Sequence, residues 1–128
     1  MTIQIVRLGT SRKSNEGIRI GTVRRPPRGV KKNEYASQNW YDVRIPNIAP
    51  TSVLMKLGQA AESNEEWSIF VKKYRKEMSN PEKSRILDLL AILSHTANFS
   101  VGCYCKNETR CHRSILRELL AEKGAKLE

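Results

Sequence analysis

The chain has 128 residues, a length that suits one domain with a single hydrophobic core. Hydrophobic residues make up 39% and charged residues 28% of the chain, which excludes a collagen-like or grossly disordered polypeptide. No stretch approaches the roughly 20 apolar residues that cross a bilayer, and the N-terminus lacks the pattern of a secretory signal. We therefore expect a soluble, cytoplasmic protein that does not bind membranes.

The net charge of +10 comes from 23 basic and 13 acidic side chains, and it is unevenly distributed. Residues 1–44 hold ten basic and three acidic side chains, whereas residues 45–80 hold five and four, and residues 81–128 hold eight and six. An anionic partner, such as nucleic acid or a phosphorylated small molecule, should therefore meet the N-terminal third first. A solvated basic surface without a specific ligand explains the same charge more simply.

The first third of the chain predicts short strands joined by basic loops. Residues 3–8 and 18–24 are rich in β-branched side chains and are separated by a turn-forming segment. Pro26 and Pro27 end the second strand, because proline has no amide hydrogen to donate to a sheet. A rigid, exposed, basic loop follows, and residues 39–45 predict a further short strand.

After Pro50 the apolar side chains recur with the period of a helix. Residues up to Leu57 predict a short helix, with Gly58 as its C-terminal cap. The spacing of residues 63–66 is that of a capping box, which begins a second helix. Residues 80–81 are an asparagine and a proline, which are typical of the N-cap and first position of a third helix.

The last third predicts one buried strand over residues 98–104 and a closing helix over residues 111–123, with Gly124 after its end. The order of elements is strand, strand, short strand, three helices, strand and helix. We therefore predict a single α/β layered domain over residues 1–128, with a small mixed or parallel sheet flanked by about four helices.

All three cysteines lie between residues 103 and 111, and an odd, local cluster argues against a disulfide framework. Cys103 and Cys105 fall at the end of the predicted last strand, and Cys111 falls at the start of the closing helix. Ligands of open α/β sheets bind at this edge, and a helix N-terminus lowers the pKa of a nearby thiol.

The residues next to the cluster complete a candidate site. His112 directly follows Cys111, and Arg110 and Arg113 flank the pair with positive charge. We predict Cys111, Cys103 and His112 as the candidate catalytic residues, with the two arginines as anion ligands. Inert cysteines buried in the core are the alternative.

Zinc is a second interpretation of the same cluster, because three cysteines and one histidine supply four ligands. The spacing C-x-C-x5-C-H lacks the paired knuckles of most structural zinc sites. The adjacent Cys111 and His112 would also point about 100° apart on a helix. We therefore predict no metal cofactor and keep a zinc-stabilised domain as an alternative.

The proline-containing loop carries a third candidate feature. Arg24 and Arg28 flank the two prolines, and arginine offers planar, bidentate hydrogen bonds to phosphate. A loop stiffened by proline also loses less entropy when it binds. We predict both arginines as anion ligands, with a solvated loop or structural salt bridges as the alternative.

At this point the chain resembles the domain of unknown function 488 (DUF488) family, whose members include the YeaO-like proteins. The run VRRPPRGVKK is similar to the D-R-x-x-P-R-G-V segment of that family. Further positions match in the same order along nearly the whole chain: Ala49, Pro50, Thr51, Leu54, Trp67, Phe70, Tyr74, Glu77, Cys103, Cys111, His112 and Arg113.

The resemblance implies a small, cytoplasmic α/β domain from a bacterium or archaeon, in a family without an established activity. It also implies that the matched arginines, cysteines and histidine share one pocket. Two positions depart from the family pattern, because Val23 and Cys105 stand where acidic residues are usual. An activity that used those carboxylates would be altered or absent here.

We expect a small protein with a phosphate-binding pocket that contains a reactive cysteine at the junction of the last strand and helix, residues 103–113. A non-catalytic, basic nucleic-acid-binding module is the first alternative. Phosphate-bearing small molecules and nucleic acid are thus the expected partners, and the reaction and oligomeric state are left open.

Overall fold

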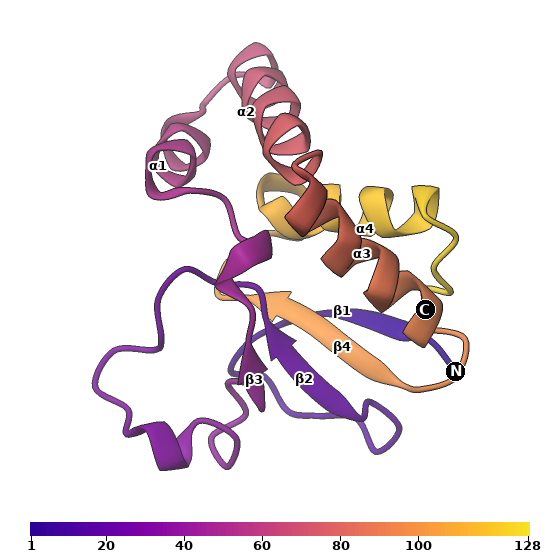
Figure 1. Ribbon diagram of the computed structural model, residues 1–128. Helices are drawn as coiled ribbons and strands as arrows, with labels where there is room; N and C mark the ends of the chain where they lie inside the picture. The colour runs from indigo at the N-terminus through magenta and orange to yellow at the C-terminus, as the bar shows by residue number, and fades with distance from the viewer.

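The computed structural model describes residues 1–128 and contains a four-stranded sheet and four α-helices (Figure 1). All strand pairs are parallel, so the expected α/β domain is confirmed and its sheet is not mixed. No helix is both long enough and apolar enough to cross a membrane. The elements are β1 (Ile3–Arg7), β2 (Ile18–Gly21), β3 (Val43–Arg44), α1 (Ser52–Ala60), α2 (Asn64–Met78), α3 (Pro81–Leu93), β4 (Phe99–Cys103) and α4 (His112–Glu122).

The strands lie in the order β1–β4–β2–β3, so the last strand of the chain lies between the first two. Val101 of β4 pairs with Ile5 on one side and with Ile20 on the other, and every residue of β4 is buried. β2 ends at Gly21, earlier than predicted, and β3 has only two residues. The chain that leaves β4 is therefore flanked by the chain that leaves β2.

The helices cover one face of the sheet (Figure 1). Four sheet residues, Ile3, Ile20, Phe99 and Val101, belong to the main hydrophobic core. Side chains from all four helices complete this core: Leu54, Phe70, Tyr74, Met78, Leu87, Leu90, Ile115, Leu116 and Leu120. Burial of these side chains against the alternate, inward residues of the strands holds the two layers together.

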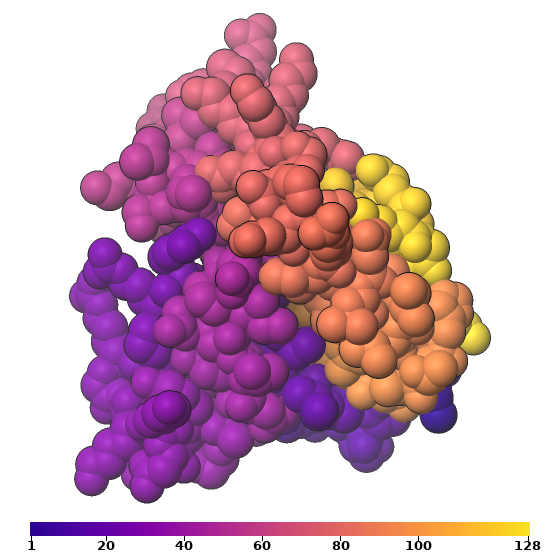
Figure 2. Space-filling model, viewed as in Figure 1, coloured from indigo at the N-terminus to yellow at the C-terminus, as the bar shows by residue number.

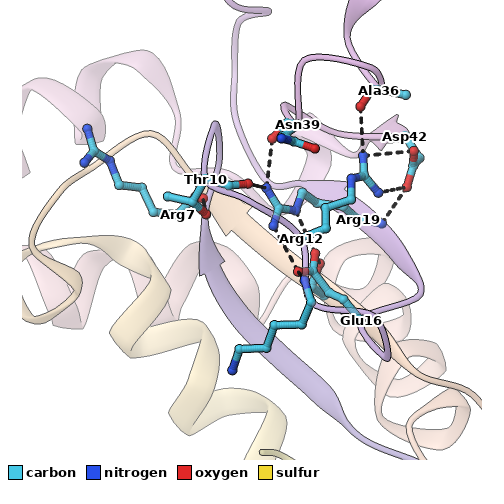
Figure 3. A network of polar contacts seen from close by, with 10 residues as sticks. Arg7, Thr10, Arg12, Glu16, Arg19, Ala36, Asn39 and Asp42 are labelled. Carbon is cyan, nitrogen blue, oxygen red and sulfur yellow. Dashed lines mark hydrogen bonds and ion pairs between the residues drawn. The ribbon is translucent and has the colours of Figure 1, made fainter.

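The opposite face of the sheet is covered by the chain between β1 and β2, which brings a buried ion pair (Figure 3). Glu16 accepts hydrogen bonds from Arg19 at 2.7 and 2.9 Å and from the Ser100 hydroxyl of β4 at 2.7 Å. The Nη1 atom of Arg19 donates to the carbonyl oxygens of Thr10 and Asn39. This network gives the second face of a parallel sheet the cover that such sheets need.

The predicted helix starts are confirmed, and one predicted end is wrong. Ser63 and Glu66 form the capping box of α2, and Asn80 caps α3. Gly58, however, lies inside α1, which continues to Ala60. A Cβ atom on Gly58 would lie 2.8 Å from the ring of Phe70, so the glycine permits close contact between α1 and α2. Its role is in packing between helices and not in helix capping.

Candidate functional site

The chain segments that leave β2 and β4 meet the N-terminus of α4 at the carboxyl edge of the sheet. β4 ends at Cys103, so Cys105 is free of the strand and the two side chains need not point to opposite faces. Cys111, the N-cap residue of α4, has an extended backbone with φ −131° and ψ 151°. The chain turns at this residue, and the Sγ atoms of Cys103 and Cys111 come to 2.6 Å.

His112 is buried beneath this cluster, and its ring orientation is set by Thr22, the residue that follows β2. Nε2 lies 2.8 Å from the carbonyl oxygen of Thr22 and 3.2 Å from the Thr22 hydroxyl. Burial lowers the pKa of His112 to about 4, while the hydrogen bond to Thr22 acts in the opposite direction. The imidazole is therefore neutral at pH 7. Nδ1 lies 3.8 Å from the sulfur of Cys111.

Arg113 places a positive charge behind the thiols. Its side chain is buried and donates one hydrogen bond, at 2.6 Å, to the carbonyl oxygen of Cys105, and its Nε has no partner. No carboxylate forms an ion pair with it. Burial lowers the pKa of Arg113, but the neighbouring groups Cys111, Cys103 and Glu108 together outweigh this and raise it overall. A buried cation without a carboxylate favours an ionised thiol beside it.

The three thiols differ in acidity. Interaction with the neighbouring thiols Cys103 and Cys111 lowers the pKa of Cys105, and the charge of Arg113 acts in the same direction. The neighbouring Cys105 and Cys111, together with burial, raise the pKa of Cys103. For Cys111, the hydrogen bond with Cys103 lowers the pKa, but the neighbouring Cys105 and burial raise it overall. Cys105 is also the one exposed cysteine, so it is the thiol that solvent and reagents reach.

A pocket of about 450 Å³ opens in front of these residues, between the loop after β2 and helix α1. Figure 2 shows the notch between α1 and the segment that begins near residue 24. Four of its lining residues carry positive charge and none carries a carboxylate. The lining consists of Val23, Arg24, Arg25, Arg28, Ser52, Met55, Lys56, Gln59, Cys103, Tyr104, Cys105 and His112.

The cations of the pocket are held in different ways. Arg24 donates hydrogen bonds of 3.1 Å to the carbonyl oxygens of Ala49 and Pro50, which fixes the loop after β2 against the start of α1. The side chains of Arg25, Arg28 and Lys56 form no hydrogen bond or ion pair within the chain. These three side chains are exposed and keep their charge available to a ligand.

Comparison with known proteins identifies the family of the chain. Residues 3–124 match the family model DUF488-N3a, which is described as the active DUF488-N3 subclade. The chain belongs to the DUF488 family. No curated protein and no solved structure matches it.

The two residues that depart from the DUF488 pattern both line the pocket. Val23 is buried in a small apolar cluster with Cys103 and Cys111, and Cys105 faces the opening. Carboxylates at these two positions would lie among the cations. With a valine and a thiol there, the pocket is purely cationic.

The predicted site residues fall into two groups. The structure brings Cys103, Cys111 and His112 together and places Arg24 and Arg28 around the same opening. Their catalytic or binding roles stay predictions. Arg110, by contrast, donates a 2.7 Å hydrogen bond to Asn64 and lies over the Trp67 ring, away from the pocket.

The predicted site residues did not include Cys105, Arg25 or Lys56. Cys105 was named as a member of the thiol cluster and Arg25 belongs to the same basic loop as Arg24 and Arg28, whereas Lys56 was not identified. The C-x-C spacing at the end of a strand could have identified Cys105, because the second cysteine lies beyond the last paired residue. No local signal identifies Lys56, which reaches the pocket from α1 through tertiary packing.

The same cluster contains ligands for a metal ion. The ligand atoms of Cys103, Cys111 and His112 lie within 4.8 Å of one another, and all three residues are buried. A neutral imidazole whose second nitrogen donates to a backbone carbonyl is also typical of a metal-bound histidine. The turn at Cys111 removes the objection that adjacent residues on a helix diverge. The donor set therefore fits zinc, in keeping with the alternative drawn from the sequence.

Proposed function

We propose that this DUF488 protein binds a phosphate-bearing ligand in the pocket between residues 24–28 and α1, with Cys105 as the reactive thiol beside it. The observation that carries the proposal is the lining itself: four cations, an exposed cysteine and no carboxylate. Such a lining attracts an anion, and Arg24 and Arg28 can offer phosphate planar, bidentate hydrogen bonds.

The surroundings of Cys105 support its role. Arg113 lies behind its backbone carbonyl without a carboxylate partner, which favours the thiolate form of a neighbouring cysteine. Cys103 and Cys111 are buried and hydrogen-bonded to each other, whereas Cys105 alone is exposed to a ligand. In this proposal the two buried thiols have a supporting role.

We also propose a cytoplasmic location for the protein. The chain has three cysteines clustered between residues 103 and 111, and an odd, local cluster of this kind is typical of proteins in a reducing compartment. Fractionation of cells that express a tagged copy of the protein tests this location. Recovery of the protein outside the soluble cytoplasmic fraction would contradict this part of the proposal.

The test of ligand binding is calorimetric titration with inorganic phosphate and with a nucleoside 5′-monophosphate. We expect Arg28→Ala and Lys56→Ala to weaken binding, because each removes a free cation from the pocket. Lys72→Ala is the matched control, since Lys72 is an exposed cation of α2 outside the pocket. Equal affinity in all four proteins would overturn the proposed site.

The test of the thiol is alkylation by iodoacetamide, followed by peptide mass spectrometry. Cys105 should be modified first, and phosphate should protect it. Metal content is determined on the same sample. Stoichiometric zinc with all three thiols unreactive would favour the zinc-stabilised domain and contradict the reactive cysteine. Slow modification of all three thiols, without protection by phosphate and without bound metal, would contradict both the reactive cysteine and the zinc site. The basic surface would then be the remaining indication of function.

A further inference from the structure

A second hollow, of about 690 Å³, lies beside the anion pocket, where it follows the loop after β2 toward the end of β1. The two hollows share four lining residues, Arg25, Arg28, Gln59 and Tyr104. They are therefore two parts of one groove, which we call the extended groove. A single phosphate group would occupy only the part near Cys105.

The whole extended groove is cationic. The second hollow adds Arg7 to the four basic residues of the first, and neither hollow has an aspartate or glutamate in its lining. Arg7 extends away from the buried network of Glu16 and Arg19 (Figure 3). Its guanidinium donates one hydrogen bond, of 3.3 Å, to the carbonyl oxygen of Tyr104 and forms no ion pair. A row of cations without counter-charges fits a ligand with several phosphates.

Two aromatic side chains lie in the second part of the groove. The rings of Trp40 and Tyr104 pack edge to face with their centroids 5.9 Å apart, and both residues are half-buried. The Tyr104 hydroxyl donates a 2.8 Å hydrogen bond to the carbonyl oxygen of Arg25. Gly9, with φ +90°, lets the backbone pass directly against the Trp40 ring. The pair is therefore held in place, and both aromatic residues line the second hollow.

We infer that the extended groove binds single-stranded nucleic acid, with the strand end at Cys105 and the next nucleotides along Arg7, Trp40 and Tyr104. The inference rests on the proposed phosphate site and names its substrate class. Alternating phosphates and bases are what a cationic groove with aromatic rings accommodates. A polyanion without bases would not stack on the aromatic rings, and a mononucleotide would occupy only the first hollow.

The experiment is a fluorescence anisotropy titration with a short 5′-phosphorylated single strand. The comparison ligands are an abasic strand of equal length, a blunt duplex and a mononucleotide as competitor. We expect the single strand to bind at least about tenfold more tightly than the abasic strand, since base stacking on aromatic rings contributes at this scale. The Trp40 fluorescence should change on binding of the single strand.

Salt dependence and variants test the groove residue by residue. Each phosphate contact in a single strand contributes about −0.7 to the slope of log affinity against log salt concentration. Arg7→Ala should make this slope shallower by about 0.7, the contribution of one phosphate contact, whereas Lys72→Ala should leave the slope unchanged. Trp40→Phe keeps a ring in place, and Trp40→Ala should lose most of the preference over the abasic strand. Circular dichroism of each variant shows that it is folded.

The outcomes separate the inference from the proposed function. If phosphate and the mononucleotide protect Cys105 but the single strand binds no more tightly than the mononucleotide, the nucleic-acid inference is wrong and the phosphate site stands. Equal affinity for the abasic strand means that the groove binds polyanions without reading bases, which also overturns the inference. Tighter binding to the duplex would do the same. If no phosphate compound binds, both the inference and the proposed function fail.

Discussion

The Nε2 atom of His112 lies 2.8 Å from the backbone carbonyl oxygen of Thr22. A carbonyl oxygen can only accept a hydrogen bond, so Nε2 carries the hydrogen and Nδ1 keeps its lone pair toward Cys111. The ring is buried and neutral, because burial lowers its pKa from 6.5 to about 4. The contact with Thr22 therefore sets the orientation and tautomer of the histidine next to the thiols, and burial sets its charge.

Protonation of His112 should therefore weaken the folded state in mild acid. The unfolded chain binds this proton near pH 6.5 and the folded chain only near pH 4. The contribution to the free energy of unfolding is fully present above about pH 6.5 and decreases by about 3 kcal/mol as the pH falls toward 4. Urea denaturation above and below this interval measures the decrease.

The matched variant for this prediction is His112→Gln, because the glutamine amide can still donate to Thr22 but does not titrate. Its free energy of unfolding should lack the decrease between about pH 6.5 and 4 that the native chain shows. Parallel pH profiles of the two proteins would show that His112 is not responsible.

Arg113 should control the reactivity of Cys105. Arg113→Met removes the buried cation next to the thiols, so we expect iodoacetamide to modify Cys105 several-fold more slowly at neutral pH. Arg117→Met is the control on the same helix, because Arg117 forms an ion pair with Glu108 outside the thiol cluster. The rate is measured by peptide mass spectrometry. An unchanged rate in Arg113→Met would show that the Arg113 guanidinium does not influence the reactivity of Cys105.

The buried ion pair between Glu16 and Arg19 should dominate the stability of the sheet's second face. Glu16→Gln leaves the guanidinium buried without a counter-charge, which costs about 3–5 kcal/mol in comparable sites. Chemical denaturation measures the loss. Glu128→Gln is the control, since that carboxylate is part-exposed and 3.8 Å from its nearest cation. A loss below about 1 kcal/mol in Glu16→Gln would contradict the structural role.

The same pair contributes to acid unfolding at lower pH. Burial raises the pKa of Glu16, but hydrogen bonds from Arg19 and Ser100 outweigh it and lower the pKa below 4.5. The stabilisation is therefore present above about pH 4.5 and is lost as the pH falls through the folded-state value. Glu16→Gln should be less sensitive to pH in this range than the native chain.

Gly58→Ala tests the contact between α1 and α2. The new Cβ atom would lie 2.8 Å from the Phe70 ring, and overpacking of this kind costs about 1–3 kcal/mol. Alanine offsets about 1 kcal/mol of this through its higher helix propensity. We expect a lower Tm and, because α1 carries Lys56, weaker phosphate binding. Val53→Ala, at an 82% exposed position of α1, should change neither. A higher Tm in Gly58→Ala would mean that α1 and α2 can shift apart to accommodate the new Cβ atom without loss of stability, which contradicts the prediction.

Much of the fold could be predicted from local patterns. The capping box at Ser63, the Asn80 cap and the buried strand that ends at Cys103 each depend on a few neighbouring residues. Gly58 could not be interpreted correctly, because its small size serves a contact with Phe70, twelve positions away in the chain. A glycine that ends a helix and a glycine that permits helix contact look the same in sequence.

The candidate site was predicted only in part. The cysteine cluster, His112 and the arginines of the loop after β2 were identified from residue type and position. Arg110 was placed at the site because it adjoins Cys111, but its side chain turns to Asn64 instead. The turn that brings Cys111 and His112 together depends on backbone dihedral angles, which neighbouring residue types do not determine.

The sequence by itself determined the α/β class, most of the elements and the location of the thiols at a strand–helix junction, because hydrophobic periodicity, caps and residue chemistry are local properties. The tertiary structure decided which side chains share a space. The insertion of β4 between β1 and β2 brings the loop of Arg24 to the thiols, and the packing of α1 adds Lys56. Burial also separates the thiols, because Cys105 is exposed whereas Cys103 and Cys111 are buried, and this difference depends on tertiary packing and not on position in the chain.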